Sequence, residues 1–262
     1  MAKMIIWRLI CCLFMWLATI NYANADVEEK TITIMADPSL TVVVSLIARD
    51  YALKNNVAIT TIFSPINQQI KAIENGEASD IIITAKPAFM DSAQQKGLID
   101  VFSKRNIARN NLVLAGIRSN FSKPNLQNAK NLHLFIDNQD DFMLVVGDVA
   151  TTAEGGYSLE AIEHYKLKKL LEPYFAFVSS AFETVNMIEE YNAIGVLFRT
   201  DAQLFPSVRE LEAFNGDAHS PLIYQAAAVV GENMELSREF IIYLSEKQAR
   251  DTFREYGFST FF

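Results

Sequence analysis

The chain has 262 residues, of which 50% are hydrophobic and 21% are charged, and its formal net charge is -8. This balance is typical of a folded globular protein and excludes a disordered, collagen-like or disulfide-stapled chain. The acidic charge also argues against nucleic-acid binding, because proteins that bind the phosphate backbone cluster lysine and arginine. The sequence has no such cluster.

The N-terminal segment has the layout of a secretory signal peptide. Lys3 and Arg8 precede an apolar run over residues 9–20, and residues 23–25 read Ala-Asn-Ala. Small residues at this place suit signal peptidase. A membrane anchor is the alternative, but this run is shorter than the roughly 20 residues that span a bilayer. We therefore expect residues 1–25 to be a signal peptide, cleaved after Ala25, and the protein to be periplasmic.

Cleavage after Ala25 removes both cysteines, Cys11 and Cys12. The exported protein would then hold no disulfide, no thiolate nucleophile and no cysteine-bound metal. A lipoprotein cysteine is disfavoured, because Arg8 stands before this pair and the apolar run mostly follows it. Cleavage also removes two basic residues and no acidic one, so the exported chain is more acidic than the whole.

From Thr31 onward, short β-rich runs alternate with amphipathic helical stretches, which predicts βαβ units and a mainly parallel sheet. A first lobe is expected over residues 26–117. Its predicted strands are Thr31–Ala36, Val57–Phe63, Asp80–Thr84 and Asn111–Ile117. Its predicted helices begin near Ser39, Ser64 and Pro87.

A second lobe is expected over residues 118–219, after a polar stretch that crosses between the lobes. Its predicted strands and helices are Met143–Val146, Tyr157–Leu171, Tyr174–Val178, Phe182–Tyr191 and Gly195–Phe198. Residues 220–262 are expected to return to the first lobe with a strand, Leu222–Val230, and two final helices. The predicted fold class is α/β, with two lobes, each a mainly parallel sheet flanked by helices. A ligand cleft is expected between the lobes, at the carboxyl ends of the strands.

Motifs for catalysis are missing from the sequence. The three histidines, His133, His164 and His219, are too far apart for metal-ligand spacing. There is no dinucleotide fingerprint, P-loop or nucleophile elbow. We therefore expect no catalytic site, no cofactor and no metal site, although a triad on dispersed residues would leave no local pattern.

Two serines stand where a predicted strand gives way to a helix, Ser39 after the first strand and Ser64 after the second. The start of a helix carries unpaired N–H groups and partial positive charge, so it can bind a tetrahedral anion. The commoner role of a serine at this place is to cap its own helix. On residue type alone, capping is favoured.

Short segments along the chain carry a family resemblance. They are Ala36–Leu40, Ser64–Gly76, Asp80–Thr84, Asn111–Leu114, Gly147–Tyr157, Gly195–Ala202 and Tyr256–Phe258. Taken in this order, they resemble the periplasmic molybdate-binding component of ABC importers, which has the two-lobed type 2 solute-binding fold. The resemblance runs through nearly all of the chain after the signal peptide.

In that family, serine hydroxyls, backbone amides and a tyrosine hydroxyl hold the oxyanion. The resemblance implies ligand-binding positions at Ser39, Ser64, Glu154, Val185 and Phe198. The two serines would donate from the first lobe, and the amide of Val185 from the second. Glu154 stands where the family has an alanine, and Phe198 replaces the tyrosine and lacks its hydroxyl. Each lost hydrogen bond to a charged ligand costs about 1.5–3 kcal/mol.

The leading hypothesis is an exported monomer that captures a tetrahedral oxyanion, molybdate or tungstate, and delivers it to the membrane permease of an ABC importer. The alternative is a diverged binding or sensor protein of the same fold, for another anion or a small organic ligand. Phe198 would then add apolar wall and Glu154 could pair with a cationic group. A third hypothesis is an exported hydrolase that uses Asp37, Asp148 and Glu154; it is disfavoured, because no nucleophile and base pair up in the sequence.

Overall fold

The computed structural model describes residues 30–118, 124–125, 129–138 and 141–261. Residues 31–262 form one compact unit. The expected signal peptide, residues 1–25, lies outside the described residues. Within the described part of the chain, no helix is long and apolar enough to cross a membrane.

The first of two five-stranded sheets has the strand order β2-β1-β3-β10-β4. Its strands are β1 (Thr31–Ala36), β2 (Ala58–Phe63), β3 (Ile81–Thr84), β4 (Arg105–Arg109) and β10 (Ile223–Ala228). The first three are parallel, whereas β10 runs antiparallel to both β3 and β4. The consecutive isoleucines of β3 are fully buried, as expected for a strand covered on both faces.

The second sheet has the order β7-β6-β8-β5-β9. Its strands are β5 (Leu112–Ile117), β6 (Leu144–Gly147), β7 (Phe175–Val178), β8 (Ile194–Phe198) and β9 (Val208–Ala213). β6 is parallel to β7 and β8, while β5 is antiparallel to β8 and β9. The mainly parallel pattern of an α/β fold thus holds in both sheets, with antiparallel strands added to each.

One strand lies in a different sheet from the one that the sequence predicts. The sequence predicts β5 as the last strand of the first lobe, residues 26–117, but its pairing with β8 and β9 places it in the second sheet. The chain therefore crosses between the sheets at Asn110 and Asn111, before this strand. The side chain of Asn110 supports the crossing, since its Nδ2 donates to Oγ1 of Thr200 at 2.7 Å and its Oδ1 accepts from the Asn111 amide at 2.9 Å.

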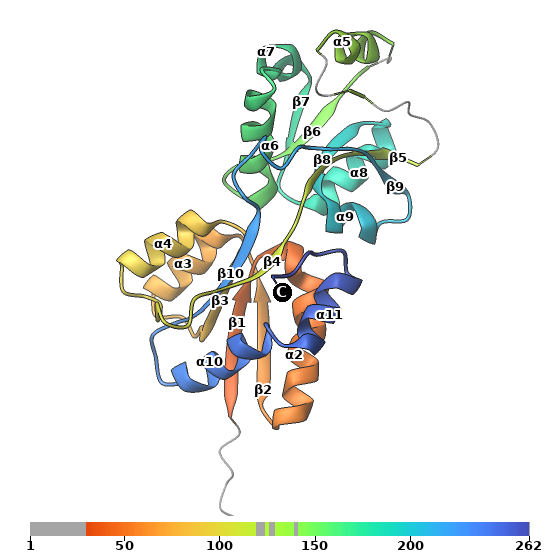
Figure 1. Ribbon diagram of the computed structural model, residues 1–262. Helices are drawn as coiled ribbons and strands as arrows, with labels where there is room; N and C mark the ends of the chain where they lie inside the picture. The colour runs from red at the N-terminus through yellow and green to blue at the C-terminus, as the bar shows by residue number, and fades with distance from the viewer. Residues whose placement is uncertain (1–29, 119–123, 126–128, 139–140, 262) are drawn as a thin grey trace, which may run out of the picture. The chain divides into compact units, whose positions relative to one another are not determined.

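Helices flank both sheets (Figure 1). Those that follow or precede strands of the first sheet are η1 (Pro38–Leu40), α2 (Thr41–Asn55), α3 (Ile66–Glu74), α4 (Pro87–Gln95), α10 (Met234–Tyr243) and α11 (Lys247–Glu255). Those of the second are α5 (Ala129–Asp137), α6 (Ala153–His164), α7 (Lys168–Leu171), η2 (Glu172–Tyr174), α8 (Ala181–Tyr191) and α9 (Arg199–Leu204). α5 begins at the end of the polar stretch, residues 118–131, that the sequence predicts as a crossing between the lobes.

Local sequence explains where α6 and α8 begin. The hydroxyl of Thr152 accepts the Gly155 amide at 3.1 Å and starts α6. Ser180 accepts the Glu183 amide at 3.2 Å, while a carboxylate oxygen of Glu183 accepts the Ser179 amide at 2.8 Å. Such reciprocal capping pairs the N–H groups that a helix start leaves free. Both starts belong to the loops that follow β6 and β7.

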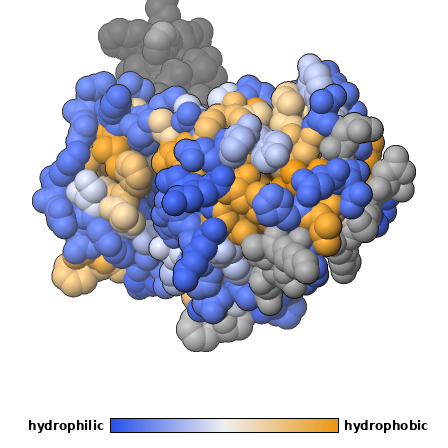
Figure 2. All heavy atoms as spheres, turned by 90° about the horizontal axis from the view of Figure 1, so that it is seen from above, coloured by the Kyte–Doolittle hydropathy of each residue, from blue (hydrophilic) through white to orange (hydrophobic). Residues whose placement is uncertain are grey.

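Apolar side chains on the surface do not by themselves mark a site. Figure 2 shows apolar side chains interspersed with polar ones on the face seen from above. Among the described residues, the most exposed large apolar side chains are spread over α2, α8, α10 and the loops: Leu53, Phe102, Phe182, Tyr191, Val230 and Ile242. Scattered apolar side chains of this kind are ordinary on a protein surface.

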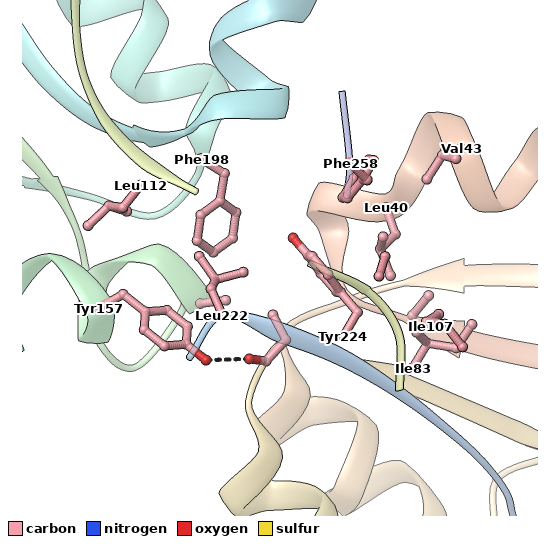
Figure 3. Close-up of a cluster of buried hydrophobic side chains, with 14 of the residues drawn as sticks. Leu40, Val43, Ile83, Ile107, Leu112, Tyr157, Phe198, Leu222, Tyr224 and Phe258 are labelled. Carbon is pink, nitrogen blue, oxygen red and sulfur yellow. Dashed lines mark hydrogen bonds between the residues drawn. The ribbon is translucent and has the colours of Figure 1, made fainter. Parts of the chain in front are cut away.

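Aromatic rings pack where the two sheets meet (Figure 3). Phe198, at the end of β8, lies 6.5 Å from the ring of Tyr224 on β10 and 6.3 Å from the ring of Tyr157 on α6. Tyr224 in turn contacts Phe258 near the C-terminus, with ring centroids 5.5 Å apart. These rings are buried, so the packing between the sheets excludes water at this point.

Candidate functional site

A cavity of about 500 Å³ lies at the carboxyl ends of strands from both sheets. Its lining comes from the segments that follow β1, β2 and β3 in the first sheet and β6, β7 and β8 in the second. The lining residues that matter below are Asp37, Ser39, Lys86, Glu154, Ser180 and Asp201. This is the position at which open α/β sheets bind ligands, and it matches the cleft that the sequence predicts.

Three helical segments present their N-terminal ends to the cavity. Ser39 belongs to η1, Glu154 is the second residue of α6, and Ala181 is the first residue of α8, and each lines the cavity. The first N–H groups of a helix have no partner within the helix and carry partial positive charge. The cavity is therefore supplied with backbone donors from both sheets.

Hydrogen bonds join the two lobes beside the cavity. The hydroxyl of Tyr157 donates to the carbonyl of Ala85 at 2.5 Å, and Figure 3 shows it pointing at this carbonyl. Asn67 donates to the carbonyl of Ala150 at 3.1 Å. Lys86 donates to the carbonyl of Val149 at 3.3 Å. Burial raises the pKa of Tyr157, so its hydroxyl keeps its proton and remains a donor.

Replacing Tyr157 with phenylalanine is expected to lower the free energy of unfolding by about 1–2 kcal/mol, because the buried carbonyl of Ala85 loses its donor. The melting temperature should fall by roughly 2–8 °C. Tyr191→Phe is the matched control, since Tyr191 is 58% exposed. Urea denaturation measures both variants, and equal stability of Tyr157→Phe and wild type would refute the argument.

Asp37 accepts hydrogen bonds from the donors at the start of η1. Its side chain is buried, and Oδ1 accepts the Ser39 amide at 3.1 Å and the Ser39 hydroxyl at 2.7 Å. The Ser39 hydroxyl also lies 2.7 Å from the Tyr224 hydroxyl. Because the single hydroxyl proton of Ser39 goes to Asp37, Tyr224 is the donor in the second contact. Burial raises the pKa of Asp37, although its bonds from Ser39 and the charge of Lys86 oppose this.

Glu154 and Asp201 add two further carboxyl groups to the lining. Burial raises the pKa of Glu154 to about 7, against the effect of a hydrogen bond from its own amide. Asp201 is 5% exposed, and its Oδ2 has no hydrogen-bond partner among the described residues. Burial and the charges of Glu154 and Asp37 raise the pKa of Asp201 well above its usual value. We call Asp37, Glu154 and Asp201 the acidic triad.

Lys86 supplies the positive charge of the cavity. It is the single basic side chain among the described residues that line it. Burial lowers the pKa of Lys86, and the charges of Asp37 and Glu154 act against this. With all groups ionised, the lining would carry three negative charges and one positive charge.

Two of the five positions that the resemblance implies, Ser39 and Glu154, line the cavity. Ser64 lies just outside the lining, although Pro65 and Asn67 belong to it. The Ser64 amide donates to the carbonyl of Ala36 at 3.1 Å, which extends the pairing of β1 with β2. Of the two serines, Ser39 therefore lines the cavity and Ser64 does not.

Val185 and Phe198 lie away from the cavity. Val185 is in the second turn of α8, is 2% exposed, and packs in an apolar cluster with residues of β5 and β8. The residues of α8 that line the cavity, Ala181 and Phe182, belong to its first turn. Phe198 is fully buried between Tyr157 and Tyr224 and is a core residue.

Sequence reasoning did not identify Lys86 or Tyr224 as site residues. Lys86 could have been found, because it follows the buried strand β3 just as Ser39 follows β1. Tyr224 lies within the predicted strand near the C-terminus, and its contact with Ser39 joins positions 185 residues apart. No local signal in the sequence indicates such a contact.

The hydrolase hypothesis finds no support in this geometry. Asp148 lies outside the lining, and its Oδ1 accepts the Ala150 amide at 2.7 Å. Asp37 is engaged with Ser39, and no histidine lines the cavity among the described residues. Within the same part of the chain, no group of three or more histidine, cysteine, aspartate or glutamate residues is placed to hold a metal ion.

Residues 32–259 match the sequence model of the bacterial extracellular solute-binding proteins. The chain belongs to this family. The match covers both sheets and every segment that lines the cavity, so the whole described fold is that of a solute-binding protein. The predicted two-lobed type 2 architecture is confirmed.

Individual relatives bear out the resemblance to molybdate-binding proteins. The chain is 27% identical over 237 residues to the molybdate-binding protein ModA of Escherichia coli (strain K12), which covers 90% of this chain and 91% of the relative. It is 28% identical over 233 residues to ModA of Haemophilus influenzae, over 87% and 89% of the two chains. The Azotobacter vinelandii periplasmic molybdate-binding protein has the same fold, with a TM-score of 0.71 at 12% identity over 88% of this chain and 100% of that one.

Proposed function

We propose that this solute-binding protein captures a small tetrahedral oxyanion, molybdate or tungstate, outside the cytoplasm and delivers it unchanged to the membrane permease of an ABC importer. The observation that carries the proposal is the convergence of three helix starts from both lobes on one cavity. Helix starts bind anions through backbone amides. The names of the Escherichia coli and Haemophilus influenzae relatives support molybdate as the anion.

Thermal unfolding of the purified protein tests the proposal, with molybdate, tungstate, sulfate and phosphate added one at a time. A ligand present at 100 times its dissociation constant adds about 2.7 kcal/mol to the free energy of unfolding. The melting temperature is then expected to rise by roughly 5–10 °C with molybdate or tungstate. No shift with any of these anions, at any pH from about 6 to 8, would overturn the proposal.

We also propose that the N-terminal segment directs export of the protein and that the exported protein is a monomer. We expect the protein recovered from the periplasmic fraction of a Gram-negative host to begin at Asp26, after removal of residues 1–25. Edman sequencing of that fraction checks this prediction. A protein that begins at Met1, or that stays with the membrane pellet, would contradict it.

A second candidate solute is a small organic molecule with a cationic group, which the acidic triad favours. Three carboxyl groups and one lysine line the cavity, so an ammonium group would find acceptors there. Apolar lining from Phe89, Phe182 and Leu204 would pack against a carbon skeleton. Small aliphatic amines belong in the same thermal panel, and a shift with amines alone would select this candidate.

A further inference from the structure

The charge of the cavity lining conflicts with that of the proposed solute. A tetrahedral oxyanion with two negative charges would enter beside three carboxyl groups, with Lys86 as the single basic side chain among the described lining residues. Like charges a few ångströms apart repel strongly in a partly desolvated site, and the usual response is that one group keeps a proton. This inference rests on the proposed function, because it concerns the capture of the same anion.

The position of Asp37 adds competition to the charge repulsion that an anion would meet in the cavity. Its Oδ1 already accepts both donors of Ser39, the amide at 3.1 Å and the hydroxyl at 2.7 Å. These are the two donors that a ligand oxygen would use at the start of this helical segment. The carboxyl group of Asp37 therefore stands in the place of a ligand oxygen, and an anion must compete with it for Ser39.

The start of α6 carries a second carboxyl group. Glu154 is the second residue of α6 and lines the cavity, so its buried carboxyl group lies beside the N–H groups of that helix start. Asp201 also lines the cavity, and its buried Oδ2 has no hydrogen-bond partner among the described residues. One helix start is thus covered by the protein's own carboxyl group, and two further buried carboxyl groups belong to the lining.

We propose that capture of the oxyanion is coupled to uptake of a proton by the acidic triad, and that Asp37 and Glu154 thereby determine which anions bind and at what pH. Protonation of Asp37 weakens its oxygen as an acceptor and frees Ser39 for the ligand. A protonated Glu154 or Asp201 also gains an O–H group that can donate to a ligand oxygen. The cavity then binds the anion with neutral donors and one lysine.

The other titratable groups around the triad do not replace this role. Those that interact with it are Lys86 before α4, Tyr157 on α6 and Tyr224 on β10, and Glu160 on α6 acts on Tyr157. Burial raises the pKa of Tyr157 and of Tyr224, so both phenols stay neutral near pH 7. Burial raises the pKa of Glu154 to about 7, so this group changes its charge at neutral pH.

Isothermal titration calorimetry with molybdate and with tungstate tests the coupling. Titrations at about pH 6, 7 and 8, each in two buffers of different ionisation enthalpy, give the number of protons taken up per anion bound. We expect an uptake of about one proton at pH 8 and an affinity that falls by about fivefold from pH 7 to pH 8. Binding without proton uptake and without pH dependence would overturn the inference and leave the proposed function standing.

Two variants test whether the acidic triad takes up the proton. Glu154→Gln and Asp37→Asn are each expected to bind the anion at least about tenfold more tightly than wild type at pH 8, with less proton uptake. Asp148→Asn is the matched control, since Asp148 precedes α6 but lies outside the cavity lining. The proton uptake of this variant should equal that of wild type. If wild type and both variants fail to bind at every pH, the proposed function falls and the coupling with it. Far-UV circular dichroism checks that each variant is folded. The titrations of the wild-type protein test the coupling even if a variant fails to fold.

Discussion

Replacing Gly155 with alanine is expected to destabilise the protein by about 3 kcal/mol and to lower its melting temperature by roughly 6–12 °C. A Cβ atom at this position would lie 2.2 Å from the carbonyl oxygen of Gly147 and 2.8 Å from its carbonyl carbon. Both atoms belong to the backbone at the end of β6, so no side chain can move aside. The first turn of α6, which carries Glu154, must shift away from the strand.

The adjacent glycine provides the control. A Cβ atom at Gly156 meets no atom within 4 Å, and both glycines lie in α6. Gly156→Ala should stabilise the protein by about 0.5–1 kcal/mol, because alanine favours the helix interior over glycine. Thermal and urea unfolding of the two variants measure the difference. If both variants lose the same stability, the close approach of α6 to β6 does not explain the glycine.

The free energy of unfolding is expected to fall by about 3 kcal/mol between pH 5 and pH 8, and Glu154 is the main cause. Burial raises the pKa of Glu154 from 4.5 to about 7 in the folded protein. Between these two values the folded state holds more protons than the unfolded state. Stability is therefore full below about pH 4.5 and is lost as the pH rises through 7. Asp37 and Asp201 act in the same direction, because burial raises the pKa of each.

Glu154→Gln removes this titration while keeping the shape of the side chain. The variant should be more stable than wild type at pH 8, and its stability should change less between pH 5 and pH 8. Glu163→Gln is the control, because Glu163 is exposed and forms its ion pair with Lys168 at the surface. Urea denaturation at several pH values measures the slopes. A slope in Glu154→Gln equal to that of wild type would contradict the assignment.

The sequence by itself determined most of the elements and their order, although it did not predict β4, β9 or α5. The isoleucine run of β3 and the alternation of β1 are local patterns of apolar residues, and both strands lie where predicted, within one residue at each end. The helix Pro87–Gln95 begins at the predicted residue, since proline favours the first turn. The place of the cavity also followed, because carboxyl ends of parallel strands meet at one edge of a sheet.

Only the tertiary structure decided which sheet takes β5 and which residues face the cavity. A strand carries the same apolar pattern in either sheet, and its partners β8 and β9 lie far along the chain, so the pattern cannot select them. Likewise, the first turn of α8 lines the cavity while Val185, one turn later, is buried in the core. The hydrogen bonds from Ser39 to Asp37 depend on the direction of the Asp37 side chain and on the exclusion of water around its carboxyl group. These are properties of the packed molecule, because burial sets both the direction of the carboxyl group and its charge.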